Sequence, residues 1–456
     1  MDHFDEEAFL HVHASEDQPV SVHMNTAKPI LQNGGWPVEI SGHPFKISGT
    51  VPWASDAYYL SGRPSFTLDP LFHAGAYYVQ EASGMFLEFA LRKTVDLSKN
   101  LRVLDLCAAP GGKSTMIQSL ITPESLLLSN EVIKTRIPVL YQNMTKWGRP
   151  NGMISNNDPA QFKKLPGFFD LLIIDAPCSG SGLFRKDPKA AVNWSEDLVR
   201  LCSHRQERIL ADAWDCLKEG GFLIYSTCSY SKEENEDKLD LICQQYQCSS
   251  VRLFPEPDWK IIETISGKAG AYGYRFYPDK VMGEGFFLSV IQKRQNNGSV
   301  QETTKPGHTN KMNWNPARVP KSVEQQLGNW IKNESLGFIP VGDAIHVLPP
   351  ALLDDFEMLK NNLYLKKAGI RAGKAGEKEW IPDHELALAD ILRADTPTTD
   401  LSYPDALLYL RGESFGPVTS EKGWKLICYR GRSLGWVKLL DKRMNNYYPK
   451  SWRIRR

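Results

Sequence analysis

The sequence predicts an α/β protein whose parallel sheet is covered by helices on both faces. Between residues 101 and 293, short apolar runs bounded by turn residues alternate with amphipathic helical stretches, a pattern typical of a parallel sheet. The clearest apolar run, FDLLIID at 169–175, is followed by proline, cysteine and a loop of serine and glycine. This pattern indicates a buried central strand, and open α/β sheets bind their ligands at such strand ends. We therefore expect a site where Asp175 and Cys178 follow this strand.

Composition limits the remaining classes. With 456 residues, 42% hydrophobic and 23% charged, the chain has room for about two to four domains of roughly 100–200 residues each. The net charge of +1 neither indicates nor excludes nucleic acid as a partner, because local basic patches matter more than the total.

The cysteines and the apolar runs bear on location. The eight cysteines show no CxxC pair and no Cys/His spacing suited to zinc, so we expect no metal and a reducing, cytoplasmic environment. The amino terminus MDHFDEEAFL lacks the pattern of a signal peptide, and no uncharged apolar run reaches about 18 residues, so we expect neither secretion nor membrane insertion.

We divide the chain into four regions. Residues 1–95 contain short strand-like pieces and a helix starting near Glu81, and they form an N-terminal lead-in. Residues 96–294 hold the α/β domain. Residues 295–320 are polar, proline-bearing and nonperiodic, which is typical of a linker. Residues 321–456 mix a helix with short strands and predict a compact α+β region.

The elements of the α/β domain follow from its periodicity. The expected strands are LRVLDL, SLLLSN, NGMIS, FDLLIID and GFLIYST, closed by GEGFFLSVIQK; the expected helices start near Lys113, Val132, Glu196 and Glu233. Ser195 should cap the third of these helices, and Ser231 with Glu234 fits a capping box for the fourth.

The small-residue loop CAAPGGKS, between the first strand and the first helix, predicts a nucleotide-like cofactor. Its alanines and glycines allow close approach, and the helix starting near Lys113 offers unpaired N–H groups. A Walker A loop is disfavoured because Cys107 stands where that motif needs glycine. Glu131 and Asp158 end the second and third strands, where they can hold ribose hydroxyls and an adenine amine. Either acid alone is more often a turn or cap residue. Together, and without a motif that binds pyrophosphate, they favour S-adenosylmethionine (SAM) over NAD.

Two cysteines should meet at one sheet edge, since Cys178 and Cys228 follow neighbouring predicted strands. A buried cysteine is usually inert, but two beside a cofactor loop suggest catalysis. Thiolate addition to C6 of a pyrimidine makes C5 electron-rich, so that C5 can accept a methyl group from SAM. Asp175 is placed to bond the ring N3 and the exocyclic amine of cytosine, and the second thiol to help remove the C5 proton. Spacing alone leaves open which thiol has which role.

Two further segments are candidates for substrate contact. Tyr78, Gln80 and Ser83 either line a pocket or pack between strand and helix. The carboxyl-terminal segment interleaves basic with aromatic residues. This pattern fits RNA binding, and it fits a solvated basic tail about equally well. Its members are Lys438, Lys442, Arg443, Lys450, Arg453, Arg455 and Arg456 with Trp436, Tyr447, Tyr448 and Trp452.

The combination LDLCAAPGGK, SNEVIKTR, NND, DAPCSGSG and STCSY resembles the Sun/Nop family of RNA cytosine-5 methyltransferases. The ending GWVK…NNYYPK is similar to the bacterial RsmF type, which methylates small-subunit ribosomal RNA. The resemblance extends over nearly the whole chain. It implies a Rossmann-like SAM-dependent methyltransferase domain, a small N-terminal lead-in and a PUA-like C-terminal domain. It also implies RNA as the partner, and we expect a monomer.

The resemblance assigns roles that spacing left open. It implies that Cys228 is the nucleophile, that Cys178 assists product release, and that Asp175 serves both catalysis and cofactor binding. The SAM-contacting positions it implies are Cys107, Ala108, Ala109, Pro110, Gly111, Gly112, Lys113, Glu131, Arg136, Asp158 and Asp175. Asn143 matches the helix after the second strand, and Arg185, Lys186 and Asp187 match a basic loop near the RNA backbone.

The chain departs from the family pattern in its lead-in, which is short and carries His23 where an arginine is usual. Two other functions fit the same motifs. One is methylation of transfer RNA. The other is a noncatalytic RNA-binding assembly factor, which the presence of both cysteines disfavours.

Overall fold

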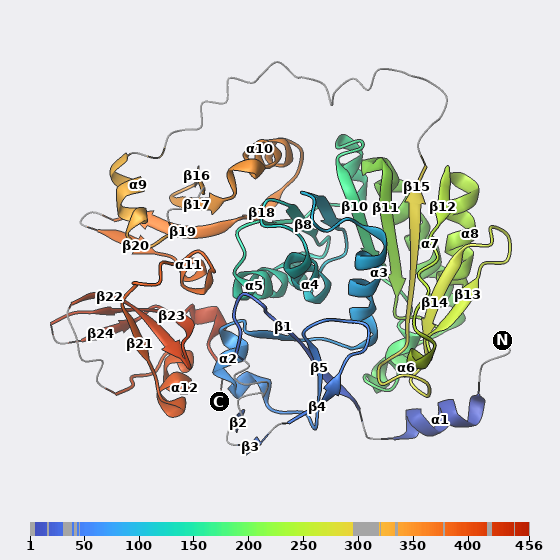
Figure 1. Cartoon of the computed structure of the whole chain (residues 1–456), viewed down its shortest axis with the longest axis horizontal. Helices are drawn as coiled ribbons and strands as arrows, with labels where there is room; N and C mark the ends of the chain where they lie inside the picture. The colour runs from blue at the N-terminus through green and yellow to red at the C-terminus, as the bar shows by residue number, and fades with distance from the viewer. Residues whose placement is uncertain are drawn as a thin grey trace, which may run out of the picture.

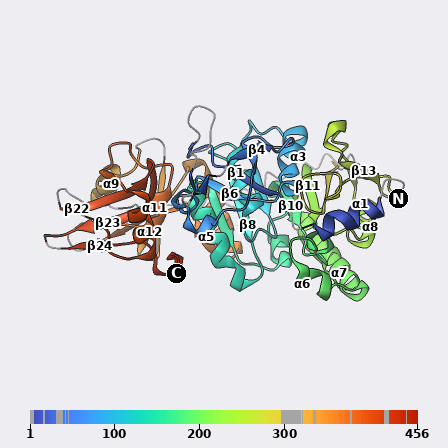
Figure 2. The same cartoon turned by 90° about the horizontal axis from the view of Figure 1, so that it is seen from below.

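The computed structural model describes residues 5–15, 18–30, 39–40, 43–44, 46–294, 319, 321–332, 336–376, 379–416, 422–441 and 443–455. Figure 1 shows a large α/β body on the right, the small blue sheet of the N-terminal region at the lower centre, and the C-terminal region on the left. Figure 2 shows the same division from below. Within the described part of the chain, no helix is both long and apolar enough to cross a membrane.

A mixed sheet forms the centre of the α/β body, in the order β13-β14-β15-β11-β10-β7-β8-β9-β18. Its parallel strands match the predicted runs: β7 (Arg102–Asp105), β8 (Leu126–Asn130), β9 (Gly152–Ser155), β10 (Phe169–Asp175) and β11 (Leu217–Thr227). The predicted closing strand β15 (Phe286–Lys293) pairs antiparallel with β11. Beyond it lie β14 (Tyr272–Phe276) and β13 (Ile262–Ile265), and β12 (Cys248–Ser250) pairs with β15.

Successive residues of each parallel strand enter opposite cores, because side chains alternate across a sheet. On one face, Val103 and Leu127 pack with helices α3 (Phe86–Thr94), α4 (Gly112–Leu120) and α5 (Ile137–Trp147). On the other face, Leu104 and Leu128 pack with α7 (Glu196–Ala213) and α8 (Glu236–Gln245). All four of these strand side chains are fully buried, and each such burial stabilises the fold by roughly 1.5–3 kcal/mol.

Helix starts agree with the sequence in one case and differ in another. The Ser195 hydroxyl accepts from the Leu198 N–H at 3.1 Å, which confirms the cap of α7. The capping box at Ser231 is wrong: this side chain makes no cap hydrogen bond, and a 3-10 turn at Lys232–Glu234 precedes α8. The carboxylate of Glu234 points instead toward the loops after β10 and β11.

The N-terminal region contains helix α1 (Glu6–Ala14) and an antiparallel sheet. The sheet has the order β4-β5-β1-β6, made of β4 (Ile47–Thr50), β5 (Ala57–Leu60), β1 (Val20–Met24) and β6 (Tyr77–Val79). A short hairpin, β2 (Glu39–Ile40) and β3 (His43–Pro44), and helix α2 (Pro70–His73) complete the region. Strand β6 leads directly into the helix that was expected near Glu81, which begins as a 3-10 turn at Ser83–Met85.

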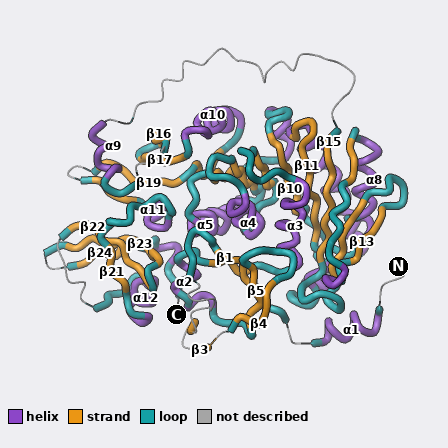
Figure 3. The backbone as a smooth tube through the Cα atoms, in the orientation of Figure 1, coloured by secondary structure: helices purple, strands orange, loops and turns teal. Residues whose placement is uncertain are grey.

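The C-terminal region is built on two small sheets, visible at the left of Figure 3. The first contains β16 (Gly337–Val341), β17 (Ala344–Leu348), β19 (Ile370–Ala375) and β20 (Trp380–Pro382). The second contains β21 (Thr398–Asp400), β22 (Gly423–Tyr429), β23 (Arg432–Leu439) and β24 (Met444–Asn446). Its helices are α9 (Lys321–Gly328), α10 (Leu353–Asn362), α11 (His384–Leu388) and α12 (Tyr403–Arg411).

This region is joined to the α/β body by strand pairing and by a shared core. Strand β18 (Leu365–Ala368) pairs antiparallel with β9 and extends the central sheet. Phe356 and Leu359 of α10 lie in the same core as Leu104 of β7. The four-region division stays a prediction, and its linker lies outside the described residues apart from Val319.

Two of the four aromatic residues of the C-terminal segment are too deeply buried to form a stacking surface. Trp436 and Tyr448 are 1% and 2% exposed and pack inside the C-terminal region, so they cannot stack on RNA bases. Tyr447 is 41% exposed and remains available. Lys438 forms an ion pair with Glu379, whereas Lys442 and Arg456 lie outside the described residues.

Candidate active site

The carboxyl ends of β10 and β11 bring two thiols together, as the sequence predicts. The strands are parallel neighbours with Asp175 opposite Ser226, and the loops that follow carry Cys178 and Cys228. Their Sγ atoms lie 3.0 Å apart. The hydrogen bond with Cys228, together with burial, raises the pKa of Cys178 well above its ordinary value. Loss of the proton from Cys178 is therefore disfavoured in the free protein.

Asp175 lies beside the thiols and is held from two sides. Its Oδ1 accepts from the Ser226 hydroxyl at 2.7 Å, and its Oδ2 lies 2.7 Å from Nζ of Lys113 on α4. Burial alone would lower the pKa of Lys113, but the nearby negative charges, with Asp175 the foremost, together outweigh it and raise that pKa. Lys113 is therefore a cation within the site.

The small-residue loop from Cys107 to Gly112 connects β7 to α4. Gly111 has φ 112°, a left-handed conformation that favours glycine. A β-carbon at Gly112 would lie 3.1 Å from the ring of Tyr78, which leaves little room for a larger residue. Two side chains from the segment after β8 hold the loop: the Arg136 guanidinium donates to the carbonyl of Ala109, and Asn143 Nδ2 donates to the carbonyl of Pro110 at 2.9 Å.

Glu131, at the end of β8, is buried and only partly satisfied. Its Oε1 accepts from the Ile133 N–H at 2.8 Å. Its Oε2 lies 3.3 Å from Nη1 of Arg136 but has no hydrogen-bond partner. A buried carboxylate oxygen without a hydrogen bond is costly unless a ligand supplies the donor.

Asp158, after β9, is placed differently. It caps the 3-10 turn Pro159–Lys164, where its Oδ1 accepts from the Ala160 N–H at 3.1 Å. Its Oδ2 forms an ion pair with Arg208 at 3.0 Å, and the side chain is 40% exposed. Both oxygens of Asp158 are therefore already engaged by the protein.

Two adjoining cavities open at this sheet edge. The larger, of about 790 Å³, is lined by Glu131, Val132 and Ile133 on one side and by α7 on the other. The smaller, of about 310 Å³, is lined by Tyr78 and Gln80 among others. The residues lining both cavities are Cys107, Ala109, Asp175, Leu183 and Cys228. The nucleophile candidate and its carboxylate thus stand where the two cavities meet.

Of the three N-terminal pocket candidates, two line the smaller cavity. Tyr78 and Gln80 do so, and Oε1 of Gln80 is buried without a hydrogen-bond partner. Ser83 is fully buried and donates to the carbonyl of Glu284 at 2.9 Å, so it packs the lead-in against the body. Sequence reasoning missed Phe286, which lines the cavity at the start of β15 and carries no motif that would single it out.

The basic loop expected near RNA divides into different roles. Arg185 is buried and forms an ion pair with Glu284 at 3.0 Å, so its guanidinium is not available to phosphate. Asp187 caps α6 (Pro188–Asn193) by accepting from the Lys189 N–H at 3.1 Å. Lys186 lines the smaller cavity and remains a candidate for substrate contact.

His23 does not replace the family's usual arginine as a phosphate ligand. Its ring is 2% exposed and stacks on Trp147, with ring centres 5.5 Å apart. Burial lowers the pKa of His23 to about 4, so the ring is neutral near neutral pH. In the described part of the chain, no group of three or more His, Cys, Asp or Glu side chains could hold a metal ion.

The strand order, the small-residue loop and the acid-bearing strand ends define a Rossmann-like methyltransferase. Residues 93–292 match the family described as 16S rRNA methyltransferase RsmB/F, residues 396–454 match the methyltransferase RsmF PUA domain, and residues 1–82 match the N-terminal domain of 16S rRNA methyltransferase RsmF. The chain belongs to the family of ribosomal RNA small subunit methyltransferases F.

Relatives with that name cover most of the chain. The protein from Vibrio cholerae is 30% identical and aligns over 88% of this chain and 84% of its own length. The protein from Shewanella loihica is 29% identical over 98% of this chain and 92% of its own.

Solved structures agree on the fold. A methyltransferase homolog from Pyrococcus horikoshii is 27% identical, with a TM-score of 0.51, and covers 63% of this chain and 90% of its own. NSun6 from Pyrococcus horikoshii, at 17% identity and a TM-score of 0.50, covers 64% of this chain and 94% of its own. At that identity NSun6 supports the fold alone.

Proposed function

We propose that this protein is a SAM-dependent RNA cytosine-C5 methyltransferase that acts on small-subunit ribosomal RNA. The observation that carries the chemistry is the pair of thiols, 3.0 Å apart, of which Cys228 lies with Asp175 where the two cavities meet. Membership of the family supports ribosomal RNA as the substrate.

The lining of the larger cavity supports the binding of SAM there. Oε2 of Glu131 is a buried acceptor without a hydrogen bond, which suits a ribose hydroxyl. The apolar side chains of Val132 and Ile133 line the same cavity and suit an adenine ring. The loop from Cys107 to Lys113 would approach the ligand through its backbone, and Arg136 acts on SAM through the Ala109 carbonyl that it holds. Asp158 would contribute only after giving up its contact with Arg208.

The smaller cavity is placed to receive the target base. Asp175 would accept from the exocyclic amine of cytosine while Lys113 and Ser226 hold the carboxylate in place. Gln80 offers a further acceptor, since its Oε1 lacks a partner. The base must leave its stack to enter such a pocket.

The reaction then follows from the thiols. The Cys228 thiolate forms a bond to C6, and the electron pair of the C5–C6 double bond moves to C5. When bound, SAM supplies the methyl group that C5 takes. Loss of the C5 proton restores the double bond and expels Cys228 as thiolate.

Cys178 is suited to the last step because its protonation depends on Cys228. The hydrogen bond to Cys228 is the largest cause of the raised pKa of Cys178. Once Cys228 is a thioether, this hydrogen-bonding partner is lost, so we expect Cys178 to release its proton to solvent more readily. The Cys178 thiolate can then take up the C5 proton.

Labelled SAM and purified RNA test the proposal directly. The protein should transfer methyl groups to small-subunit ribosomal RNA or to the assembled subunit, and bisulfite mapping should locate 5-methylcytosine. Transfer RNA serves as the parallel substrate. Label on transfer RNA alone would overturn the ribosomal assignment. Binding of SAM and RNA without any transfer would make the protein an assembly factor rather than an enzyme.

A further inference from the structure

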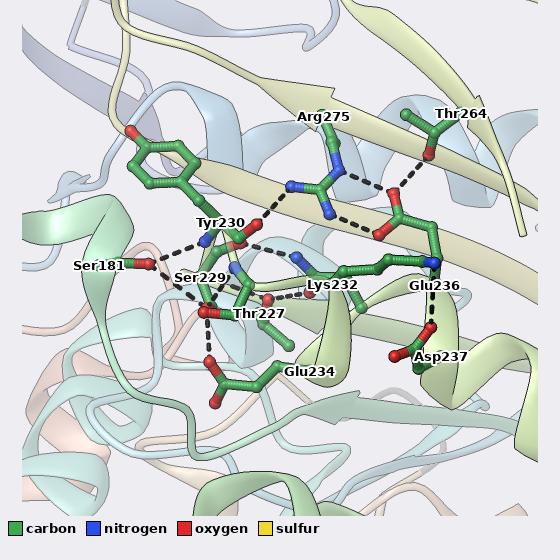
Figure 4. A network of polar contacts seen from close by, with 12 residues as sticks. Ser181, Thr227, Ser229, Tyr230, Lys232, Glu234, Glu236, Asp237, Thr264 and Arg275 are labelled. Atoms are coloured by element: carbon green, nitrogen blue, oxygen red, sulfur yellow. Dashed lines mark hydrogen bonds and ion pairs between the residues drawn. The ribbon is translucent and has the colours of Figure 1, made fainter. Parts of the chain in front are cut away.

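Glu234 is hydrogen-bonded to both cysteine loops, and Figure 4 shows its contact with Ser229. It ends the 3-10 turn after β11, and its side chain is fully buried. Oε1 accepts from the Ser179 N–H at 2.8 Å and from Gln206 Nε2 at 3.2 Å. Oε2 accepts from the hydroxyls of Ser179 and Ser229.

The partners of Glu234 are the immediate neighbours of the two thiols. Ser179 follows Cys178, and Ser229 follows Cys228. One carboxylate therefore connects the backbone segment of one sulfur to that of the other. Hydrogen bonds from an ionised acceptor to several donors are strong, and they fix the geometry of the groups that they join.

The surrounding contacts support the same connection. The Gly182 N–H donates to the carbonyl of Cys228 at 2.9 Å. Asn235, next to Glu234, donates through Nδ2 to the carbonyl of Ser229 at 2.8 Å. The negative charge of Glu234 is also among the causes that raise the pKa of Cys178.

We infer that Glu234 is a positioning residue that holds Cys178 and Cys228 at reacting distance by binding the serine that follows each of them. The inference rests on the proposed function for its catalytic meaning, but the geometric claim can be measured without any RNA. Glu234 is not among the residues that line either of the two cavities. It acts through Ser179 and Ser229.

Disulfide exchange measures the separation of the thiols directly. One oxidised glutathione and the two protein thiols give one protein disulfide and two reduced glutathiones, so the equilibrium constant reports how readily the sulfurs meet. Peptide mass mapping identifies the Cys178–Cys228 disulfide in the full chain. Cys243 and Cys248, whose Sγ atoms lie 3.5 Å apart, provide an internal reference away from Glu234.

Glu234→Ala should lower the equilibrium constant for the Cys178–Cys228 disulfide by about tenfold, the effect of losing roughly one net hydrogen bond between the loops. The Cys243–Cys248 disulfide should be unchanged. Glu234→Gln keeps the volume and one acceptor oxygen, so it should lose less. Glu233→Ala is the matched control, since Glu233 is an exposed carboxylate on the same turn.

Two outcomes would overturn the inference. One is an unchanged Cys178–Cys228 disulfide in Glu234→Ala. The other is an equal loss at both cysteine pairs, which would mean that Glu234 serves general folding; Glu234→Gln gives the same comparison if the alanine variant does not fold.

The enzymatic consequence is a separate measurement. With substrate RNA and SAM, Glu234→Ala should accumulate the covalent RNA adduct, because attack by Cys228 needs one thiol and release needs both. A simple loss of activity without adduct would contradict this role. Failure of the wild type to methylate RNA would contradict the proposed function while leaving the disulfide result intact.

Discussion

The Sγ atoms of Cys178 and Cys228 lie 3.0 Å apart although 50 residues separate them in the chain. Parallel pairing of β10 with β11 sets this distance, because it brings the loops after both strands to one edge of the sheet. Cys228 lines both cavities, whereas Cys178 lines only the larger one. We therefore expect the two sulfurs to act at different stages of the reaction.

Replacing each cysteine alone should separate these stages. Cys228→Ala should abolish both the covalent RNA adduct and methylation, by about a thousandfold or more, because the bond-forming sulfur is absent. Cys178→Ala should form the adduct and retain it, because proton removal from C5 is slowed. Denaturing gel electrophoresis of the protein with labelled RNA measures the adduct. An adduct in Cys228→Ala, and none in Cys178→Ala, would reverse the two roles.

The buried carboxylate of Glu131 should dominate SAM affinity. Glu131→Gln exchanges one acceptor oxygen for an amide that cannot accept from a ribose hydroxyl, so we expect about a tenfold or greater loss in SAM affinity by calorimetry. Asp158→Asn is the matched control, because Asp158 already binds Arg208 and the Ala160 N–H. We expect the loss of SAM affinity in that control to be less than about threefold. An equal loss in both variants would place Asp158 against the ligand as closely as Glu131.

Local patterns predicted the strand ends well, because a parallel strand is marked by its own apolar run and turn. Asp175, Cys178 and Cys228 were therefore found from sequence. Contacts between distant segments leave no such signal. Arg185 has the residue type of a phosphate ligand, yet Glu284, 99 residues further on, occupies its guanidinium. Glu234 fitted a helix cap because no local feature indicates that its partners lie in two other loops.

The sequence predicts a PUA-like C-terminal domain beyond a linker, and strand β18 connects this region to the α/β body. It is an edge strand of the central sheet, and its flanking residue Tyr364 donates its N–H to Oδ1 of Asn157 at 3.0 Å. Asn157 in turn accepts through its carbonyl from Nδ2 of Asn130, which precedes Glu131. The segment that carries Glu131 is therefore held in place by residues that follow the predicted linker.

Truncation after residue 294 should accordingly weaken SAM binding as well as RNA binding. Removing Phe356 and Leu359 of α10 exposes the core that they share with Leu104. The free energy of unfolding should fall by roughly 1.5–3 kcal/mol for each buried side chain that is lost. Thermal denaturation and SAM calorimetry on residues 1–294, compared with the full chain, test this. Undiminished SAM affinity and stability in the fragment would show that the tail is separable after all.

Burial of Lys28 should make the free energy of unfolding rise as the pH rises. Its Nζ donates to the carbonyls of Ala74, at 2.9 Å, and of Lys146. Burial lowers the pKa of Lys28 from 10.5 to about 7. Between these values the unfolded chain binds the extra proton, so the free energy of unfolding rises with pH.

Lys28→Met removes this contribution. Urea denaturation from about pH 7 to pH 9 should show the wild type gaining stability on the variant by up to about 1.4 kcal/mol per pH unit. Other titrating groups, including Lys146, are common to both proteins and cancel in the difference. The two carbonyls left without a donor add a loss in the variant that does not vary with pH. Parallel curves for the two proteins would mean that Lys28 keeps its charge when folded.

Arg185 and Lys186 are adjacent in the chain, but replacing Arg185 should reduce stability whereas replacing Lys186 should weaken RNA binding. Arg185→Met leaves Glu284 as a buried carboxylate without its cation, so we expect a loss of about 3–5 kcal/mol in the free energy of unfolding. Lys186→Met should leave stability within about 0.5 kcal/mol. It should instead weaken RNA binding and lower the slope of log K against log salt by about 0.7–0.9, the effect of one lost phosphate contact. Chemical denaturation and RNA titrations at several salt concentrations measure the two effects. A reduced salt slope in folded Arg185→Met would show that this guanidinium, despite its buried pair, reaches the RNA.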